Sequence, residues 1–192
     1  MKEETWRDCI VTFIDVTGTN KAIKSGGSKG TDLMRALHRL AQKSVLHDHD
    51  CAYCWNDSVL LLAFWNKERT SGIRILREIS ELKQRIDTQI RKSYAICVKG
   101  QALSGGSKQR VTGKCTVLKT WSYAMANCFS IEAKAKNNES LRANWYVDSW
   151  IKKPLANLCP KTFPMKMLPD NNVRKILRLS DDDVKKLVSE VA

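Results

Sequence analysis

The segment that decides the fold is residues 9–18, with the sequence CIVTFIDVTG. Its first six residues are almost entirely apolar, which is typical of a buried strand, and they run directly into Asp15. A second carboxylate, Asp57, interrupts the apolar stretch of residues 51–65. A charge beside a core is costly unless it is paired, so two such carboxylates on neighbouring strands indicate a shared pair of divalent metal ions. Taken singly, each aspartate is better explained as the cap of a turn.

The composition is that of a soluble globular protein. The chain has 192 residues, of which 43% are hydrophobic and 28% charged, so it fits one domain with a single core. The polar start MKEETW gives no indication of a signal peptide. No apolar run approaches the ~18 residues of a membrane span. We therefore expect a cytoplasmic protein with no membrane partner.

The net charge of +13 implies attraction to polyanions, which include nucleic acid, acidic lipid and nucleotide phosphates. The excess is spread along the chain rather than gathered in a basic tail. Most of it is therefore explained as the solvated faces of helices.

Two clusters of possible metal ligands are weak. The seven cysteines are odd in number and scattered, so they predict no disulfide framework. Cys51 and Cys54 form a CxxC pair on a predicted strand, where residues three apart point to opposite faces. The sequence HDHD at residues 47–50 lies between a predicted helix and a predicted strand, and we interpret it as a solvated loop.

The pattern of elements predicts an α+β fold with a ferredoxin-like βαββαβ core and an appended strand, helix and strand. A loop is expected at residues 21–30, and Asn56 with Asp57 is expected to form the turn of a hairpin. Four prolines predict irregular chain after residue 154, and Ser180 with Asp183 predicts a capping box for a last helix. We expect one domain over residues 1–158 and a proline-broken segment with a short helix over residues 159–192. The expected strands are residues 9–14, 51–55, 59–65, 93–103, 111–118 and 144–148, and the expected helices are residues 31–47, 73–90 and 121–138.

This succession resembles the class III nucleotidyl cyclases. In that family an aspartate ends the first strand and is soon followed by glycine, as Asp15 is by Gly18, and a second aspartate lies on the next hairpin, as Asp57 does. Gly100 is similar to the glycine on the strand after the second helix, and Glu132 matches the end of the third helix. The resemblance covers residues 8–150. No single motif is specific, and its weight comes from order and spacing together.

The resemblance implies a metal-dependent enzyme in the domain of residues 1–158. Such enzymes convert a nucleoside triphosphate to a 3′,5′-cyclic monophosphate and pyrophosphate with two divalent metal ions, Mg²⁺ or Mn²⁺. Their active sites form between two chains, so the resemblance implies a head-to-tail homodimer and no stable nucleic-acid partner. It implies that the metals are held by Asp15, Asp57 and the carbonyl of Val16, and that the phosphates are bound by backbone N–H groups of Thr17, Gly18 and Thr19.

The residue that reads the base differs from the family's usual ones. Adenylyl cyclases carry a lysine four residues before the hairpin aspartate, guanylyl cyclases carry an acid there, and this chain has Tyr53. A tyrosine beside Thr120, near the family's second base-reading position, favours a pyrimidine. This pattern is similar to the pyrimidine cyclases of bacterial anti-phage (Pycsar) defence, which make cyclic UMP or cyclic CMP. Alternatively, Tyr53 is only a strand aromatic that packs on its neighbours.

One departure concerns the transition state. The family's third helix usually carries an asparagine and, four residues later, an arginine, and these positions are Ala126 and Ser130 here. Asn127 lies one residue away, and we count it among the predicted substrate contacts. The cations that could replace the arginine are Lys99, which we also predict to contact substrate, Lys134 and Arg142.

Two alternatives follow from that departure and from the charge. The chain could be a degenerate cyclase that binds nucleotides without turnover. It could also be an RNA-binding ferredoxin-like domain. However, RNA-recognition domains display aromatic residues on two central strands, and residues 59–63 and 94–98 lack that display.

Overall fold

The computed structural model describes residues 5–24, 28–44, 47–65, 72–104, 108–110, 116–118, 122–148 and 160–189. It contains a seven-stranded sheet in the order β2-β3-β1-β4-β7-β9-β8 and a separate pair, β5-β6. The strands are β1 (Thr5–Val16), β2 (Cys51–Trp55), β3 (Ser58–Phe64), β4 (Ser93–Ser104), β5 (Lys108–Arg110), β6 (Thr116–Leu118), β7 (Trp145–Asp148), β8 (Lys161–Met167) and β9 (Asn172–Leu179). The helices are α1 (Thr19–Lys24), α2 (Ser28–Gln42), α3 (Gly72–Gln89), α4 (Tyr123–Lys136), a 3₁₀ turn at Glu139–Leu141 and α5 (Asp181–Ser189).

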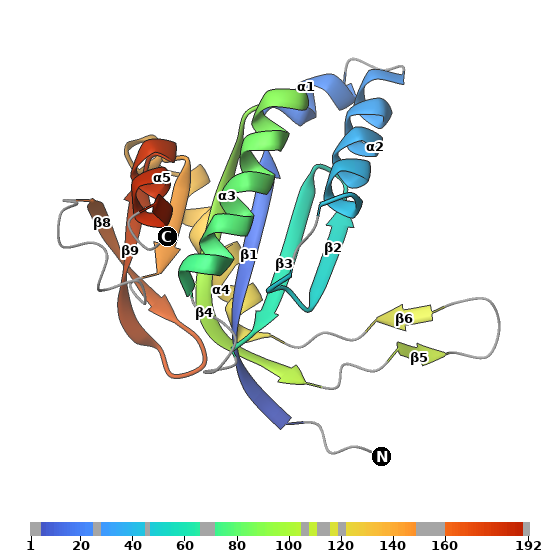
Figure 1. Ribbon diagram of the computed structural model, residues 1–192. Helices are drawn as coiled ribbons and strands as arrows, with labels where there is room; N and C mark the ends of the chain where they lie inside the picture. Colours follow the sequence, from blue (N-terminus) through green and yellow to red (C-terminus); the bar gives the residue numbers. More distant parts are fainter. Residues whose placement is uncertain are drawn as a thin grey trace.

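The apolar segment that begins at Cys9 lies in β1, which is an inner strand of the sheet. β1 pairs with β3 on one side and β4 on the other, both antiparallel, and its residues from Cys9 to Val16 are all buried. Alternate β1 residues point to opposite faces: Ile10 and Ile14 join the core under α2 and α3, while Val11 and Phe13 join the core under α4. The sheet therefore lies between two helical layers (Figure 1).

Most of the predicted elements are confirmed, and the fold class is α+β with the expected βαββαβ order. The Asn56–Asp57 turn joins β2 to β3, and Asn56 has a positive φ of 48°, as a tight hairpin turn requires. The predicted helices at residues 31–47, 73–90 and 121–138 correspond to α2, α3 and α4. The predicted strand at residues 111–118 is described only as β6, since residues 111–115 lie outside the described residues.

The loop expected at residues 21–30 is partly wrong. Residues 19–24 form the short helix α1, and α2 already begins at Ser28. Gly30 lies in α2, and a Cβ built on it would come within 3.1 Å of the Ile23 backbone. The two helices therefore approach closely, so this glycine serves helix packing rather than a loop.

The irregular chain expected in the C-terminal part is also wrong. Residues 161–179 form the hairpin β8–β9, and β9 pairs with β7, so the hairpin extends the main sheet. Pro164 lies inside β8, which is tolerated because β8 is an edge strand. The last helix begins after Ser180 as predicted. The domain boundary expected at residue 158 falls outside the described residues.

The two clusters at residues 47–54 have structural roles. The HDHD segment is a loop, as predicted, and His47 and Asp50 are exposed. The His49 side chain is the exception, since it is 2% exposed and its Nδ1 lies 2.8 Å from Glu78. Cys51 and Cys54 pack against opposite cores of the sheet, as predicted. Within the described part of the chain, no group of three or more His, Cys, Asp and Glu side chains could hold a metal ion. None of the described helices is long and apolar enough to cross a membrane.

Candidate active site

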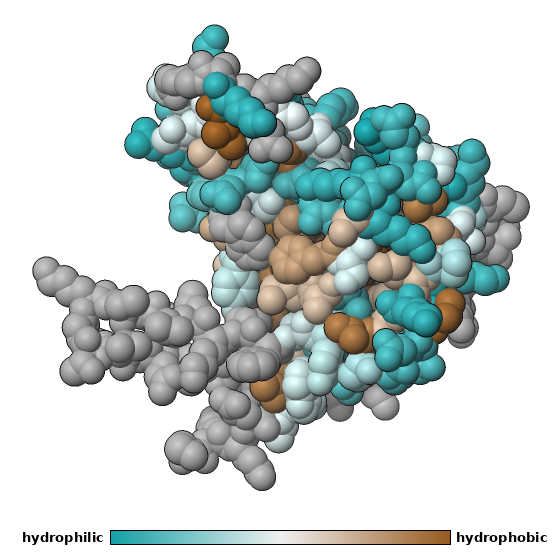
Figure 2. Space-filling model, turned by 180° about the vertical axis from the view of Figure 1, so that it is seen from behind, coloured by the Kyte–Doolittle hydropathy of each residue, from teal (hydrophilic) through white to brown (hydrophobic). Residues whose placement is uncertain are grey.

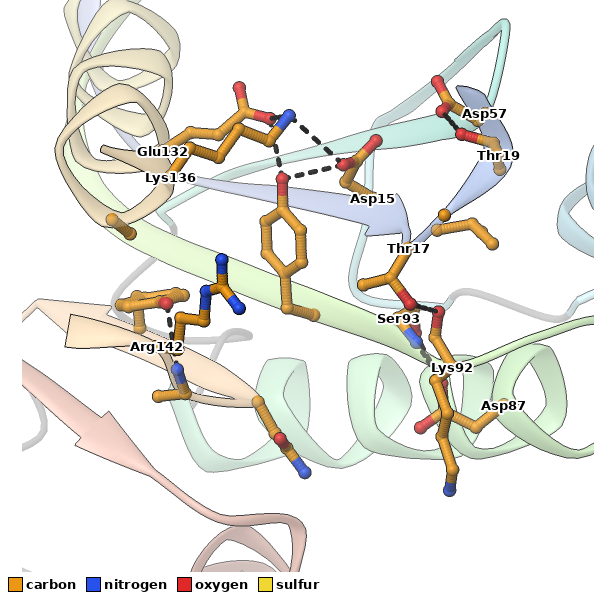
Figure 3. A pocket seen from close by; sticks show the side chains of 17 residues that line it. Asp15, Thr17, Thr19, Asp57, Asp87, Lys92, Ser93, Glu132, Lys136 and Arg142 are labelled. Atoms are coloured by element: carbon orange, nitrogen blue, oxygen red, sulfur yellow. Dashed lines mark hydrogen bonds and ion pairs between the residues drawn. The ribbon is translucent and has the colours of Figure 1, made fainter. Parts of the chain in front are cut away.

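A cavity of about 590 Å³ opens where β1 ends and β4 and β7 begin. The ends of α3 and α4 complete its wall (Figure 3). This volume is in the range of small-molecule sites. The residues that line it are Asp15, Val16, Thr17, Gly18, Thr19, Asp57, Asp87, Lys92, Ser93, Tyr94, Glu132, Ala135, Lys136, Arg142, Ala143, Asn144 and Tyr146. All the residues predicted to hold metal or phosphate are therefore at one cavity.

Asp15 is the buried carboxylate of this cavity, and it is 7% exposed. Ser58 Oγ donates a hydrogen bond to Oδ1 at 2.7 Å, and the Tyr94 hydroxyl lies 2.7 Å from Oδ2. Burial raises the pKa of Asp15, and the charge of Asp57 adds to the rise, although the bonds from Ser58 and Tyr94 and the charge of Lys136 oppose it. The ionised form of this carboxylate is therefore disfavoured in the folded protein, and such perturbed groups are common at functional sites.

Asp57 is brought to Asp15 by the hairpin. The β1–β3 register places Asp15 opposite Ser58, and the Asp57 carbonyl accepts a hydrogen bond from the Val16 N–H at 3.1 Å. The Thr19 hydroxyl donates to Asp57 Oδ2, so the residue that begins α1 orients this carboxylate. Thr19 is itself buried.

The turn after Asp15 is fixed by the segment between α3 and β4. The N–H and the hydroxyl of Thr17 both donate to the Lys92 carbonyl at 2.8 Å. Gly18 has φ +74°, and its carbonyl accepts a hydrogen bond from the Arg91 guanidinium at 3.1 Å. The Thr17 N–H, which we expected to face phosphate, is therefore already bonded within the chain.

Among the cavity residues that sequence reasoning missed, Tyr94, Glu132 and Lys136 form a connected group on Asp15. The Tyr94 hydroxyl lies 2.7 Å from Glu132 as well as from Asp15, and a single phenol proton can serve only one of them at a time. Lys136 lies 2.7 Å from Glu132 Oε1 and 3.6 Å from Asp15 Oδ2. The signal available in the sequence was the Glu132–Lys136 spacing of four on a predicted helix.

Other predicted site residues lie away from the cavity in this chain. Tyr53 is half-buried on β2 and packs on the α4 side of the sheet, the side that Asp15 also faces. Lys99 pairs with Asp8 at 3.6 Å, and its ammonium lies 4.9 Å from the centre of the Trp65 ring. Thr120 lies outside the described residues.

Asn127 is used to hold the chain together. Its side chain is buried, its Nδ2 donates to the Leu168 carbonyl, and its Oδ1 accepts from the Leu168 N–H. These two bonds join α4 to the end of β8. A contact between Asn127 and a nucleotide would require this buried side chain to be uncovered.

The donor set suits a hard divalent cation. Mg²⁺ is commonly held by one or two carboxylates, with waters and substrate phosphates completing its shell, so Asp15 and Asp57 need no third acidic residue. The hydroxyls of Ser58 and Thr19 already orient the two carboxylates. The positive charge of a bound dication would also offset the effects of burial and of the Asp57 charge, which raise the pKa of Asp15.

The comparisons with known proteins concern the fold. The sequence matches no protein-family model and no curated protein. A bacterial light-regulated adenylyl cyclase superposes with a TM-score of 0.65 at 10% identity, over 98% of this chain and 100% of that chain. The adenylyl cyclase CyaB from P. aeruginosa gives 0.58 at 9% identity, over 93% and 96%. The catalytic core of a rhodopsin-guanylyl cyclase with converted specificity, in complex with ATPαS, gives 0.57 at 10% identity, over 94% and 100%. The chain therefore has the fold of class III cyclase domains.

Proposed function

We propose that the protein is a metal-dependent nucleotidyl cyclase, which converts a nucleoside triphosphate to a 3′,5′-cyclic monophosphate and pyrophosphate. The observation that carries this proposal is the convergence of Asp15 and Asp57 at one cavity, in a chain with the fold of adenylyl cyclase domains. Asp15 lies near the end of β1, and Asp57 lies in the turn that leads into β3, the strand paired with β1.

The chain's residues have distinct roles in this proposal. Asp15 and Asp57 hold two divalent ions, which supply acidification of the ribose 3′-hydroxyl and neutralisation of phosphate charge. Ser58 and Tyr94 hold the Asp15 carboxylate in position, and Thr19 holds Asp57. Gly18 has a positive φ of 74°, which favours glycine, and so lets the turn after Asp15 form.

The test is a product assay on the purified protein. It is incubated with Mn²⁺ or Mg²⁺ and each of the four ribonucleoside triphosphates, and cyclic products are identified by liquid chromatography and mass spectrometry. Asp15→Asn and Asp57→Asn are expected to abolish product. The matched control is Asp32→Asn, which removes an exposed carboxylate from α2. Absence of cyclic product from all four nucleotides, or full activity in Asp57→Asn, contradicts the proposal.

The proposed substrate is UTP or CTP. The support is Tyr53, because a tyrosine lacks the positive charge of the lysine that reads adenine. Tyr53 also lies on the sheet face toward which Asp15 points. A base reader supplied by one protomer to the other's metals would sit on this face. Tyr53→Ala is expected to raise the specificity constant for ATP and GTP relative to UTP and CTP. A preference for ATP in the wild type contradicts the pyrimidine proposal alone. The role of the product as a second messenger in anti-phage defence rests on the sequence resemblance.

A homodimer with composite sites is part of the proposal. The face of the sheet behind α2 and α3 has an apolar area ringed by hydrophilic residues (Figure 2). Trp6 and Phe129, which is on α4, are 43% and 37% exposed. Aromatic residues are enriched in the buried centre of interfaces. Light scattering at high protein and nucleotide concentration should show a dimer, and a monomer under these conditions contradicts it.

A nucleotide-binding protein without turnover is the second candidate. The observation that favours it is that both oxygens of Asp15 already have partners within the chain, Ser58 and Tyr94. The product assay separates the two candidates, because this one predicts nucleotide binding with no cyclic product. The RNA-binding alternative has no support in the geometry, since α4 covers β1 and β4 on the sheet face that faces away from α2 and α3.

A further inference from the structure

We propose that Lys136 is a catalytic residue that contacts the phosphates of the substrate bound by its own chain. This inference rests on the proposed function and goes beyond it, because it assigns the cation that offsets phosphate charge to the end of α4. The role needs no residue from a second protomer.

The position of Lys136 is the first argument. It is the last residue of α4, it lines the cavity, and its ammonium lies 3.6 Å from Asp15 Oδ2. Glu132, one turn earlier on the same helix, holds the ammonium at 2.7 Å and so directs it toward the cavity. Figure 3 shows the Lys136 side chain extending from the helix toward Asp15. Any phosphate bound through metal to Asp15 would lie within reach of this flexible side chain.

The other candidate cations are used elsewhere. Lys99 is five residues along β4 from Tyr94, the partner of Asp15, which is roughly 17 Å of strand. Lys134 donates to the Pro164 carbonyl at 2.9 Å and lies over the Phe163 ring, on the far side of α4's last turn.

Two more cations line the cavity without reaching the acidic pair. Arg142 is 68% exposed and pairs with Glu139. Lys92 lies between α3 and β4, where its backbone carbonyl holds Thr17. Among the ion pairs of the described residues, the pair with Lys136 is the one that involves a predicted metal ligand, Asp15.

The chemistry gives Lys136 a defined task. The 3′-oxygen forms a bond to the α-phosphorus, the bond from that phosphorus to the bridging oxygen of the β-phosphate breaks, and pyrophosphate leaves with the electron pair. The 3′-hydroxyl proton passes to solvent. Negative charge shifts toward the leaving oxygens, and an ammonium that remains protonated stabilises it by hydrogen bonds. Before substrate binds, Glu132 and Asp15 hold this ammonium; on binding, it moves to the phosphates.

The experiment compares Lys136→Gln and Lys136→Arg with Lys185→Gln. Lys185 is the matched control, since its side chain is also 58% exposed and ion-paired to an acid on its own helix. With the wild-type enzyme's preferred nucleotide, kcat of Lys136→Gln should fall about 100-fold or more, with a smaller change in KM. Lys136→Arg should recover part of the rate, and Lys185→Gln should stay within about twofold of wild type.

A binding measurement keeps the inference independent of turnover. The affinity for a non-cyclisable α,β-methylene triphosphate, measured by calorimetry with Mn²⁺, should fall in Lys136→Gln and not in Lys185→Gln. Wild-type kcat and analogue affinity in Lys136→Gln overturn the inference while leaving the proposed cyclase activity standing. If the wild type forms no cyclic product, the proposed function fails, and the catalytic role of Lys136 is overturned with it.

Discussion

The Tyr94 hydroxyl lies 2.7 Å from Oδ2 of Asp15, across two strands on which these residues stand directly opposite each other. The register of β1 with β4 therefore places a phenol donor on the buried carboxylate. This donor is fixed by backbone pairing rather than by a loop, and it keeps its proton, because burial and the charge of Asp15 raise the pKa of Tyr94.

Tyr94→Phe is expected to destabilise the fold. It leaves a buried carboxylate oxygen without its hydroxyl donor, which costs roughly 1–3 kcal/mol. Urea unfolding of the metal-free protein measures the difference. Saturating Mn²⁺ should reduce it, since the ion would satisfy the same oxygen. A change below about 0.5 kcal/mol would show that the bond contributes little.

Asp15→Asn is expected to stabilise the metal-free protein while it abolishes activity. Burial raises the folded-state pKa of Asp15 above its ordinary value of 3.8, so the ionised carboxylate weakens the fold. This penalty is absent below pH 3.8 and grows as the pH rises through the raised pKa. Melting temperatures in chelator should therefore be higher for the variant at pH 7, and the gap should close toward pH 3.8. A lower melting temperature for the variant at pH 7 would contradict this account.

Much of the site was predictable because it lies on local chain features. Asp15 at a strand end and Asp57 in a hairpin turn are fixed by hydrophobic pattern and turn chemistry, which the sequence carries directly. Tyr94, Glu132 and Lys136 come together only through the β1–β4 register and the packing of α4, and neither is visible in a local pattern. The β8–β9 hairpin was missed for a related reason. Proline argues against a strand in general, and only the position of β8 at the sheet edge makes Pro164 acceptable.

Gly100→Ala is expected to disturb the packing of α4 on β4. A Cβ at this position would lie 2.9 Å from Ala124 Cβ, closer than real Cβ atoms approach, and 3.1 Å from its Cα, which is a tight contact. Overpacking of this kind costs about 1–3 kcal/mol. The double variant Gly100→Ala, Ala124→Gly tests the cause, because it removes the 2.9 Å contact between the two Cβ atoms, although the contacts to the helix backbone remain. The glycine in the helix itself costs about 1 kcal/mol. Additive losses in the double variant would place the cause elsewhere.

Ser180→Ala is expected to cost about 0.5–2 kcal/mol, since it removes the cap of α5. Ser180 Oγ accepts from the Asp183 N–H at 3.1 Å, and Asp183 Oδ2 accepts from the Ser180 N–H at 2.8 Å. The bonds that Asp183 Oδ2 accepts from the N–H and the hydroxyl of Ser180 lower the pKa of Asp183. Its contribution is therefore present above pH 3.8 and is lost as the pH falls through the lowered value. Asp182→Asn, an exposed neighbour, is the control for thermal unfolding. Equal losses in both variants would argue against the capping box.

The proline in β8 also affects whether the sheet edges of two molecules can pair with each other. The seven-stranded sheet ends at β2 on one side and at β8 on the other. At the β8 edge, Pro164 has no N–H, and its carbonyl is taken by Lys134. A strand from another molecule would thus find a break in the hydrogen-bonding ladder there, and the flanking Lys161 and Lys166 would repel a second copy of the same edge. This edge is protected against strand-to-strand aggregation, so unwanted growth of the sheet is confined to the β2 side.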